Sequence, residues 1–543
     1  MKRDLKKLAS ETLDILVVGG GAHGAAIAYH AAMAGYKIAL IDKNDFCSAT
    51  SANSLKILHG GLRYLQHLDI RRMRHSIMAR REMMRLAPHL VHPLSCIMPA
   101  YGHGLRGKKI MQAALFLNDC ISWDRNIGLP ADIQLPPGFT VSKKRCQELI
   151  PEIRTEGLHG ASIWHDALAV DTERLIMTYL LEAANLGARA ANYTEATMIN
   201  KEGDGLYCVS VKDNFTQQVH IVKTRFIVNA AGPWIENLSS VIKSPDSTPQ
   251  KWAMALNLVT RKKIFGKNAV ALEGNNAYED KDAIIKRGKR LYFFVPWRGY
   301  TMIGTDYQAS TANPDGLQIK REDIQQMIND INAIYPPAQL TYEDVSFYHA
   351  GLLPMTPKIE AGEDNVQLEK NSQIHEHVKN GFKGIFSIKG VKYTTAPHIA
   401  REIVHLLQKR FLPAKTVNKK QPAPDNGWQP ENQAISGLLK KRYGCQAARV
   451  AHYLPEEQGD VWIDKTAGFL KAEVDYLIQE EMACTLSDIV LRRTGLGSAE
   501  CPSRKILAEI AAVMAAILDW DEERKKKEIE DVLCRYLPLI LPV

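Results

Sequence analysis

The chain has 543 residues, of which 45% are hydrophobic and 24% charged, a balance typical of a soluble globular protein that excludes a disordered or fibrous chain. At roughly 100 to 200 residues per domain, this length predicts two or three domains with large cores. The formal net charge of +9 comes from Lys and Arg spread along the chain, which favours anionic ligands or acidic lipid surfaces. No zinc-finger spacing or RNP-type aromatic pattern accompanies it, so we expect no nucleic-acid partner.

The pattern of cysteines and the length of the apolar runs indicate in which cell compartment the protein works. Nine cysteines are scattered without a C-x-x-C pair, which predicts a reducing environment with no disulfide framework and no metal site. Residues Met1 to Leu13 lack the apolar centre of a secretory signal, and no apolar run reaches the roughly 18 to 20 residues that span a bilayer. The longest run, Ile506 to Trp520, carries Glu509 and predicts a buried helix. We therefore expect a cytoplasmic protein, either free or associated with the inner face of the membrane.

The N-terminal segment predicts a βαβ unit. Asp14 to Val18 is an apolar run typical of a strand, and Ala25 to Ala34 has helical spacing. Gly35 ends the helix, and Lys37 to Asp42 is a second apolar strand.

The middle of the chain contains both helical spacing and strand-like runs of apolar residues. This mixture predicts an α/β fold with a second sheet inserted into the first. Helical spacing occurs at Ile70 to Leu86 and Thr172 to Leu186. The strand-like stretches are Tyr207 to Val211, Ile221 to Val228, Leu291 to Val295 and Tyr300 to Gly304.

A Pro-rich stretch, Leu412 to Gln433, predicts a linker. Helical spacing follows to the end of the chain, so we expect a C-terminal helical domain. Its predicted helices are Ile435 to Tyr453, Lys471 to Leu491, Lys505 to Leu518 and Asp521 to Tyr536.

The first chemical motif is Gly19-x-Gly21-x-x-Gly24, between a predicted strand and helix. Its glycines permit a tight turn, close approach of a pyrophosphate to the backbone and close helix packing. The N-terminus of the following helix favours negative charge, and Asp42, at the end of the next strand, is suited to accept from a ribose hydroxyl. The motif predicts a dinucleotide site but does not separate NAD from FAD.

The segment after Asp42 is rich in hydroxyls. Residues Ser48 to Leu65 read Ser-Ala-Thr-Ser-Ala-Asn-Ser-Leu-Lys-Ile-Leu-His-Gly-Gly-Leu-Arg-Tyr-Leu. Small hydroxyl residues suit hydrogen bonds to a second phosphate, and the glycine pair lets backbone pass close to a flat ring.

This segment and the fingerprint resemble the FAD-dependent glycerol-3-phosphate dehydrogenases, within the D-amino-acid-oxidase-like flavoproteins. Residues 50 to 65 are close to the family's T-S-x-x-S-x-K-x-x-H-G-G-L-R-Y-L run. Further similar motifs occur in order at Asp171 to Leu175, Val228 to Trp234, Val295 to Trp297, Ile303 to Asp306, Gly390 to Thr395 and Asp488 to Leu496.

The resemblance implies an α/β fold in which a Rossmann-like FAD-binding domain carries an inserted, sheet-bearing substrate domain, with an all-helical C-terminal domain. We expect an oxidoreductase region at 1–411, a linker at 412–433 and the helical domain at 434–543. The expected FAD-binding segments are about 12–100, 160–240 and 345–411, and the substrate segments are about 101–159 and 241–344.

The resemblance also implies FAD as the cofactor. The residues expected to bind it come from the fingerprint, the hydroxyl-rich loop and the later motifs. They are Gly19, Gly21, Ala22, His23, Gly24, Asp42, Lys43, Thr50, Ser51, Ser54, Gly60, Gly61, Leu62, Ala196, Ala231, Gly232, Gly390, Val391, Lys392 and Thr394.

For the substrate, the resemblance implies that Arg63, Lys392 and Thr394 face the flavin, with Tyr64 close by. Arg63 and Lys392 are suited to hold an anion or polarise an alcohol oxygen. His59 is expected either to accept the hydroxyl proton, while a hydride passes to flavin N5, or to shape the flavin loop through hydrogen bonds. The expected reaction is oxidation of a secondary alcohol, with glycerol 3-phosphate or a related polyol phosphate as substrate.

A second expectation concerns the helix from about Ala396 to Leu407. Thr394 and Thr395 stand where it should start, and Pro397 is tolerated in a first helical turn. A helix N-terminus aimed at the flavin would stabilise its anionic reduced form.

Two segments depart from the family's pattern. Leu353 stands where the family's Y-x-G-x-R-P-L segment supplies a phosphate-binding Arg, and Trp252 to Asn257 replaces a K-G-S-H-type stretch. Losing one hydrogen bond to a charged group costs about 1.5 to 3 kcal/mol. Either His349 or Arg298 compensates, or the substrate is a different hydroxy acid or an amine, for which a pocket lined by Leu352, Leu353 and Met355 is better suited. A flavin-carrying protein without turnover is a third hypothesis.

The partners are the least determined part. Gly104 to Leu117 combines cations with apolar residues and is compatible with a membrane interface that places the flavin near a quinone, or with a plain surface helix. Quinone and oxygen both stay open as electron acceptors, and a homodimer is compatible with the sequence.

Overall fold

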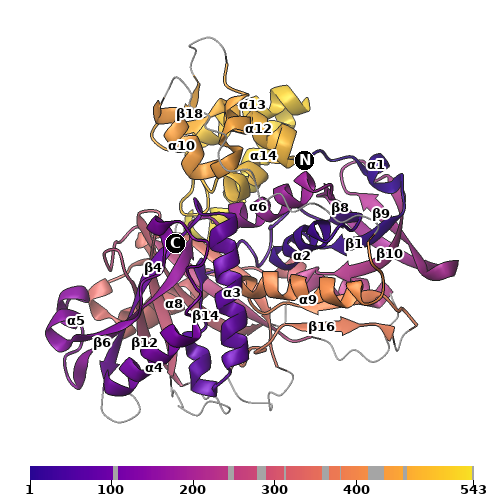
Figure 1. Ribbon diagram of the computed structural model, residues 1–543. Helices are drawn as coiled ribbons and strands as arrows, with labels where there is room; N and C mark the ends of the chain where they lie inside the picture. The colour runs from indigo at the N-terminus through magenta and orange to yellow at the C-terminus, as the bar shows by residue number, and fades with distance from the viewer. Residues whose placement is uncertain are drawn as a thin grey trace.

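The computed structural model describes residues 1–101, 108–241, 250–277, 289–310, 313–356, 366–378, 381–413, 433–455 and 461–540. Their strands form two large sheets and one two-stranded ribbon, and helices gather at one end of the molecule (Figure 1). The predicted linker lies outside these residues from 414 to 432.

The first sheet is built around the predicted βαβ unit. Its core runs parallel in the order β17 (Ile385–Lys389), β10 (Val219–Asn229), β1 (Leu13–Val18), β2 (Ile38–Ile41) and β7 (Arg189–Ala191). Three strands join it antiparallel to their neighbours, namely β8 (Thr194–Glu202), β9 (Leu206–Asp213) and β16 (Gln373–Glu376).

Both faces of this sheet are covered. Ile15 and Val17 of β1 pack in the core shared with four helices, whereas Leu13 and Leu16 pack on the opposite side with the β8–β9 hairpin. Burial from both sides explains why β1 is a continuous apolar run and not an alternating one. The helices on the first face are α2 (Ala22–Met33), α3 (Ile70–Leu86), α6 (Thr172–Asn185) and α9 (Ala396–Gln408). On the other face lie α1 (Leu5–Ala9) and α7 (Ile235–Val241).

The second sheet confirms the predicted insertion. The chain enters it after β2, leaves it for β7, re-enters it after β10 and leaves it again for β16. Its order is β15 (Val345–Pro354), β11 (Trp252–Thr260), β14 (Tyr300–Ser310), β13 (Lys289–Trp297), β12 (Ala269–Ala277), β4 (Val91–Tyr101), β6 (Leu158–Ala169) and β3 (Ile57–Leu58), with β5 (Phe139–Ser142) beside β6.

The boundaries of the segments differ from expectation in one respect. β4, β6 and β15 pair within the second sheet, although the expected FAD-binding segments included most of their residues. Long antiparallel partners hold them there, which a segment-by-segment comparison of motifs does not reveal. The helices that contact this sheet include α4 (Lys108–Ile121), α5 (Lys143–Leu149) and α8 (Arg321–Ile334).

The C-terminal region is helical with one exception. A short ribbon of β18 (Trp462–Asp464) and β19 (Phe469–Leu470) interrupts it, so the expectation of an all-helical domain is wrong at this point. Asp464 accepts the N–H groups of Thr466 and Ala467, which closes the turn between the strands. The helices are α10 (Gln433–Tyr443), α11 (Ala447–Ala451), α12 (Lys471–Glu481), α13 (Arg504–Leu518), α14 (Glu522–Leu533) and α15 (Leu537–Ile540).

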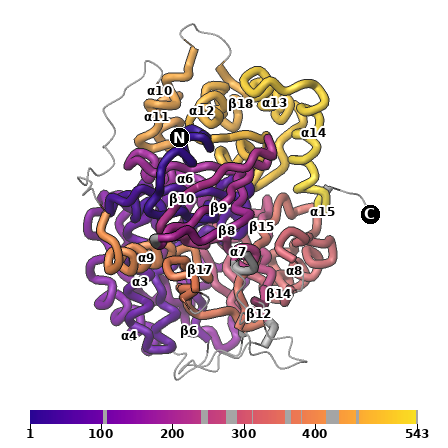
Figure 2. Tube along the Cα trace, turned by 90° about the vertical axis from the view of Figure 1, so that its right-hand side faces the viewer, coloured from indigo at the N-terminus to yellow at the C-terminus, as the bar shows by residue number. Residues whose placement is uncertain are grey.

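This region docks on both sheets. Figures 1 and 2 place its helices together at one end, beside α6 and the N-terminus. Its core is continuous with second-sheet residues such as Val259, Trp297 and Phe347. The predicted helix at Lys505 to Leu518 is α13, with one face buried, and no helix among the described residues is long and apolar enough to cross a membrane.

Candidate functional site

One cavity of about 1340 Å³ runs between the two large sheets. It begins at the carboxyl ends of the parallel strands, where Val18, Asp42 and Ala230 line it. It ends at second-sheet residues that include Tyr307 and Leu353. Ligands of open α/β sheets bind at the carboxyl ends of their strands, so the position suits a nucleotide at one end and a small molecule at the other.

Two of the fingerprint glycines, Gly19 and Gly24, occupy positions where backbone atoms exclude a side chain. Gly19 has φ +108°, and a Cβ there would lie 2.5 Å from the carbonyl oxygen of Ala230. A Cβ on Gly24 would lie 1.8 Å from the carbonyl oxygen of Gly19. α2 starts directly after Gly21, so its N-terminal N–H groups face the cavity with the dipole that favours phosphate.

Asp42 lies beside this turn at the end of β2. Its carboxylate accepts from the Gly20 N–H at 2.6 Å and from the Asn44 N–H at 2.9 Å. Burial raises the pKa of Asp42 to about 6. The carboxylate lines the cavity and is ionised above that pH, which suits it to accept hydrogen bonds from ribose hydroxyls.

The hydroxyl-rich loop wraps the next part of the cavity. The Ser51 hydroxyl accepts from the Ala22 N–H at 3.0 Å, and the Thr50 hydroxyl bonds to both backbone groups of Leu352. Lys56, which the sequence did not single out, is fully buried and binds the Glu173 carboxylate at 2.9 Å. The loop is therefore held by its own protein contacts, with Thr50, Ser51 and Ser54 along the cavity wall.

His59 and Asp166 form a pair that the sequence did not predict. His59 Nδ1 lies 3.2 Å from Asp166 Oδ2, and the ring, 44% exposed, lines the cavity. Asp166 also accepts from the Gly60 N–H and from Arg80, each at 2.6 Å. Burial raises the pKa of Asp166, but the hydrogen bond from His59 and the charge of Arg80 hold it well below its usual range. A permanent carboxylate at Nδ1 leaves Nε2 as the free ring nitrogen.

Lys392 and Tyr64 form a second pair in the cavity. The Lys392 ammonium donates to the Tyr64 hydroxyl at 2.7 Å. The Arg72 guanidinium lies 4.2 Å from the centre of the same ring, and Arg72 also lines the cavity. Burial raises the pKa of Tyr64, but the charges of Lys392 and Arg72 outweigh it, so the net shift is downward. Arg63 and the buried Thr394 line the same cavity.

The start of α9 partly follows the expectation. α9 begins at Ala396 with Pro397 in its first turn, as predicted. The Thr395 hydroxyl, however, donates to the Lys392 carbonyl at 2.9 Å and makes no cap bond. Gly390 lies against His23, since a Cβ there would meet the ring at 2.4 Å. His23 Nε2 is buried without a hydrogen-bond partner among the described protein groups, so this nitrogen can still accept or donate one hydrogen bond.

Two of the expected substrate residues lie away from the cavity, and the structure corrects them. His349 is buried against Trp297 and Phe347, and its Nε2 lies 3.0 Å from the Ser498 carbonyl oxygen. On β15 it is four residues from Leu353, which is about 13 Å of extended strand. Arg298 donates to Asp171 at 2.8 Å and to the Gly495 carbonyl at 2.9 Å. Both side chains bind the C-terminal region.

The departures from the family's pattern do lie in the cavity. Leu353 lines it together with Leu352, whereas Met355 packs against Ala253 and Val366. Arg290 of β13 also lines this end of the cavity, where it donates to the Tyr307 carbonyl at 3.3 Å and to the Val366 carbonyl at 2.7 Å. No motif in the sequence indicated Arg290, and only the folded structure shows that it lines the cavity.

Most of the residues expected to bind FAD line the cavity, and two lie behind its wall. Gly24 does not line the cavity but allows α2 to pack closely against the Gly19 turn. Gly60 does not line it either, and its N–H donates to Asp166. Among the described residues, no group of three or more His, Cys, Asp or Glu side chains is placed to hold a metal ion. The cavity is lined by Gly19, Gly21, Ala22, His23, Asp42, Lys43, Thr50, Ser51, Ser54, Gly61, Leu62, Ala196, Ala231, Gly232, Gly390, Val391, Lys392 and Thr394.

These features fit FAD. The helix N-terminus and glycine turn suit its pyrophosphate, Asp42 suits its ribose, and His23 lines the same cavity. The cavity is long enough to continue to the residues expected to bind substrate.

Comparison with known proteins agrees with this fit. Residues 14–406 match the FAD dependent oxidoreductase family, and residues 396–525 match the C-terminal domain of alpha-glycerophosphate oxidase. A glycerol-3-phosphate dehydrogenase of Synechocystis is 27% identical over 97% of each chain. Glycerol-3-phosphate dehydrogenase 2 of Mycobacterium tuberculosis is 28% identical over 98% of this chain and 89% of that protein.

Solved structures share the fold. The glycerol-3-phosphate dehydrogenase from Bacillus halodurans, complexed with FAD, superposes with a TM-score of 0.71 at 22% identity, over 99% of this chain and 98% of that one. The L-alpha-glycerophosphate oxidase from Mycoplasma pneumoniae, with FAD bound, covers 75% of this chain and 97% of its own with a TM-score of 0.52 at 19% identity. These structures confirm the predicted fold class, and the family match over residues 14–406 together with the relatives confirms the resemblance and the FAD cofactor. Because the first family match spans most of the described cavity and most of the sequence, the chain belongs to the FAD-dependent oxidoreductase family.

Proposed function

We propose that this enzyme oxidises a secondary alcohol that carries an anionic group, with glycerol 3-phosphate or a related polyol phosphate as the first candidate. The observation that carries the proposal is the presence of the His59–Asp166 pair and the Lys392–Tyr64 pair in the cavity that holds the FAD fingerprint. When bound, FAD supplies the two-electron acceptor. The glycerol-3-phosphate dehydrogenases among the relatives support the same substrate.

The side chains take distinct roles in this proposal. His59 accepts the hydroxyl proton at Nε2, because Asp166 holds a hydrogen on Nδ1 and stabilises the positive ring. Lys392 orients the alcohol oxygen as a point charge, with Tyr64 as its neighbour. Arg63 and Thr394 hold the remainder of the substrate. The glycines, Asp42 and the hydroxyl-rich loop hold FAD.

Two cations that the sequence did not reveal lie near the anionic group in this proposal. Arg72 lies over Tyr64, and Arg290 lines the end of the cavity near Leu353. Arg72 also donates to the Lys370 carbonyl at 3.1 Å, and Arg290 donates to the Val366 carbonyl at 2.7 Å. Their positive charge favours a phosphate at the cavity wall. They support a phosphate substrate in spite of Leu353.

Leu353 supports a second candidate. With Leu352 it gives one end of the cavity an apolar wall, which suits a less charged hydroxy acid or an amine. The scaffold does not decide between them, because one fold carries many substrates.

The electron acceptor and the membrane are part of the proposal. α4 exposes Phe116 at 72% and Leu117 at 43%, and Trp123 after it is 74% exposed. We infer a peripheral contact between this helix and the inner face of the membrane, which favours quinone over oxygen. Residues 104–107 of the predicted segment lie outside the described residues. The compartment is cytoplasmic in this proposal, and a homodimer is compatible with it.

The test is anaerobic reduction of the bound flavin. Glycerol 3-phosphate should bleach the yellow protein at a rate measurable by stopped flow, and Lys392→Met should slow bleaching about 100-fold while leaving FAD bound. Lys409→Met, on the exposed end of α9, is the matched control. Bleaching by hydroxy acids or amines but not by glycerol 3-phosphate would select the second candidate. Bleaching by dithionite alone would select a flavin carrier without turnover.

A further inference from the structure

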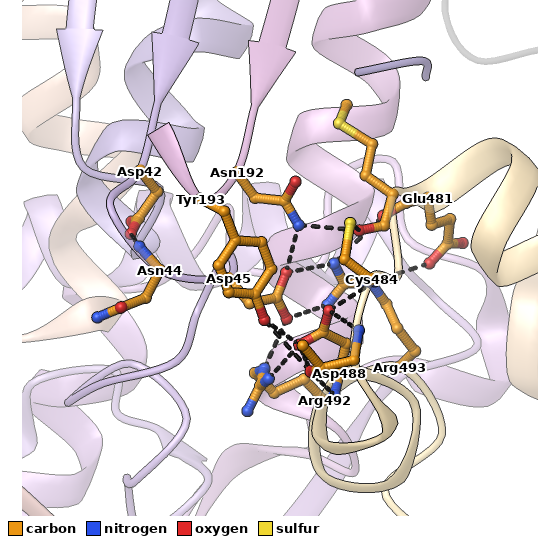
Figure 3. A network of polar contacts seen from close by, with 12 residues as sticks. Asp42, Asn44, Asp45, Asn192, Tyr193, Glu481, Cys484, Asp488, Arg492 and Arg493 are labelled. Atoms are coloured by element: carbon orange, nitrogen blue, oxygen red, sulfur yellow. Dashed lines mark hydrogen bonds and ion pairs between the residues drawn. The ribbon is translucent and has the colours of Figure 1, made fainter. Parts of the chain in front are cut away.

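A second feature of the FAD site involves the C-terminal region. The loop after β2 carries Asp42 at the ribose end of the cavity, and three residues later Asp45 is 1% exposed. Asp45 does not line the cavity. Its carboxylate points instead toward the C-terminal region (Figure 3).

Two arginines of that region bind Asp45. Arg493 donates to both carboxylate oxygens, at 2.8 and 2.7 Å, and Arg492 Nε donates to one of them at 2.6 Å. Both belong to one turn of π-helix, Asp488–Arg493. Two-pronged contacts of this kind fix orientation as well as distance.

The neighbouring turn of the FAD domain is tied to the same helix. Asn192 donates to Asp45 at 3.0 Å and to the carbonyl of Met482 at 2.8 Å. The Tyr193 hydroxyl donates to Asp488 at 2.6 Å, and the Tyr193 N–H donates to the carbonyl of Asn44 at 2.9 Å. The two turns that border the ribose end are therefore bound to each other and to the C-terminal region (Figure 3).

The ion pair is buried on both sides. Arg493 is fully buried, and Arg492 is 11% exposed. Burial raises the pKa of Asp45, but Arg493 and Arg492 outweigh it and hold the pKa at about 2. Buried ion pairs add little net stability compared with an apolar contact, so a role in fixing one conformation is the better account.

The loop after β2 connects Asp45 to Asp42, which lines the cavity. Asp42 and Asp45 share the short turn whose Asn44 N–H binds the Asp42 carboxylate. The Thr194 N–H donates to the Asp42 carbonyl at 2.6 Å, and Thr194 lines the cavity. Displacing Asp45 therefore displaces Asp42.

We propose that Asp45, Arg492 and Arg493 form a positioning clamp, through which the C-terminal region sets the affinity of the FAD domain for the adenosine half of FAD. The clamp residues do not touch the cofactor. They act through Asp42. By linkage, FAD binding strengthens the docking of the π-helix to the same extent as docking strengthens FAD binding.

The experiment uses the full-length apoprotein and half-cofactor probes. Arg493→Lys keeps the charge but removes the two-pronged contact. Its Kd for FAD and for ADP should rise about tenfold, while its Kd for FMN, which lacks the adenosine half, should not change. Arg442→Lys is the matched control, because Arg442 pairs with Glu473 inside the C-terminal region, away from the loop. Its three dissociation constants should equal those of the wild type.

Two outcomes would overturn the proposal. One is an unchanged Kd for FAD and ADP in Arg493→Lys with a lowered unfolding temperature, which would make the clamp a structural ion pair only. The other is an equal rise for FMN and ADP, which would mean general loosening of the cavity. If Arg493→Lys does not fold, Arg492→Lys, which loses a single bond to Asp45, takes its place with the same expected pattern.

Hydrogen exchange supplies a second readout without turnover. FAD added to the wild type should slow exchange of the amides of residues 488–493, and this protection should shrink in Arg493→Lys but not in Arg442→Lys. Identical protection in all three proteins would contradict the coupling.

Discussion

The two ends of the cavity are built in different ways. The nucleotide end comes from one continuous βαβ unit, in which Gly19, Gly24 and Asp42 lie within 24 positions and meet through local geometry. The substrate end comes from segments far apart, where Lys392 meets Tyr64 across 328 positions and His59 meets Asp166 across 107.

This difference predicts that mutations at the two ends of the cavity have different effects on FAD binding and on turnover. A change at the nucleotide end should release FAD whatever the substrate, because its parts act as one turn. A change at the substrate end should alter rate or specificity and leave FAD bound. The following variants separate the two ends.

The largest expected effect is at His59. His59→Gln should lower the rate of anaerobic flavin reduction about 1000-fold, since a positioned base contributes about 100- to 10,000-fold. The Kd for FAD should stay within about twofold of the wild type. His405→Gln, exposed on α9, is the control. If the rate is kept at saturating FAD and the FAD affinity falls instead, His59 shapes the loop and is not the base.

The opposite pattern is expected at Gly24. Gly24→Ala should weaken FAD binding by about 100-fold or more, because its Cβ would lie 1.8 Å from the Gly19 carbonyl oxygen. The measurement is the flavin absorbance retained after gel filtration. Gly437→Ala is the matched control, because no atom lies within 4 Å of the added Cβ. FAD retained by Gly24→Ala would show that the turn can widen, which would remove the contrast between the two ends.

A smaller effect is expected at Leu353. Leu353→Arg should lower the KM for glycerol 3-phosphate about tenfold, since one hydrogen bond to a charged group contributes about 1.5 to 3 kcal/mol. The same change should raise the KM for apolar hydroxy acids. Leu353→Met keeps the apolar wall and serves as control. If the preference between glycerol 3-phosphate and apolar hydroxy acids does not change, Arg72 or Arg290 already neutralises the charge of the phosphate.

The smallest effect concerns pH at Asp42. The pKa of Asp42 is raised from 3.8 to about 6, so the buried ionised form is disfavoured and apoprotein stability from this group falls as pH rises from about 4 to 6. FAD binding needs the ionised carboxylate. The Kd for FAD should therefore rise severalfold as pH falls from 7 to 5. Asp42→Asn should bind FAD more weakly, with a Kd that changes little over this range; an equal pH dependence in both proteins would assign it to another group.

Much of the fold followed from local patterns. The strand at β1, the helix at α3, the start of α9 and the inserted second sheet were predictable, because periodicity and turn residues act within a few positions. The all-helical C-terminal domain was not. The β18–β19 ribbon depends on a turn closed by Asp464, whose flanking strands are too short to carry a periodic signal.

The site divides in the same way. The glycine fingerprint, Asp42 and the Gly390 to Lys392 segment were identified from sequence and line one cavity. His349 and Arg298 were expected there because they are near Leu353 or Trp297 in sequence, and strand geometry carries both toward the C-terminal region.

The sequence by itself determined that a dinucleotide turn exists, because glycines at fixed spacing are required wherever backbone meets a pyrophosphate. The choice of FAD over NAD came from the resemblance of residues 50 to 65 and the later motifs to a known family. Only the tertiary structure decided that Asp166 orients His59, that Arg72 and Arg290 face the cavity, and that Asp45 joins the C-terminal arginines. Charged side chains are common on any chain, and a partner hundreds of positions away leaves no local pattern. Their roles therefore appear only when packing removes the water between them.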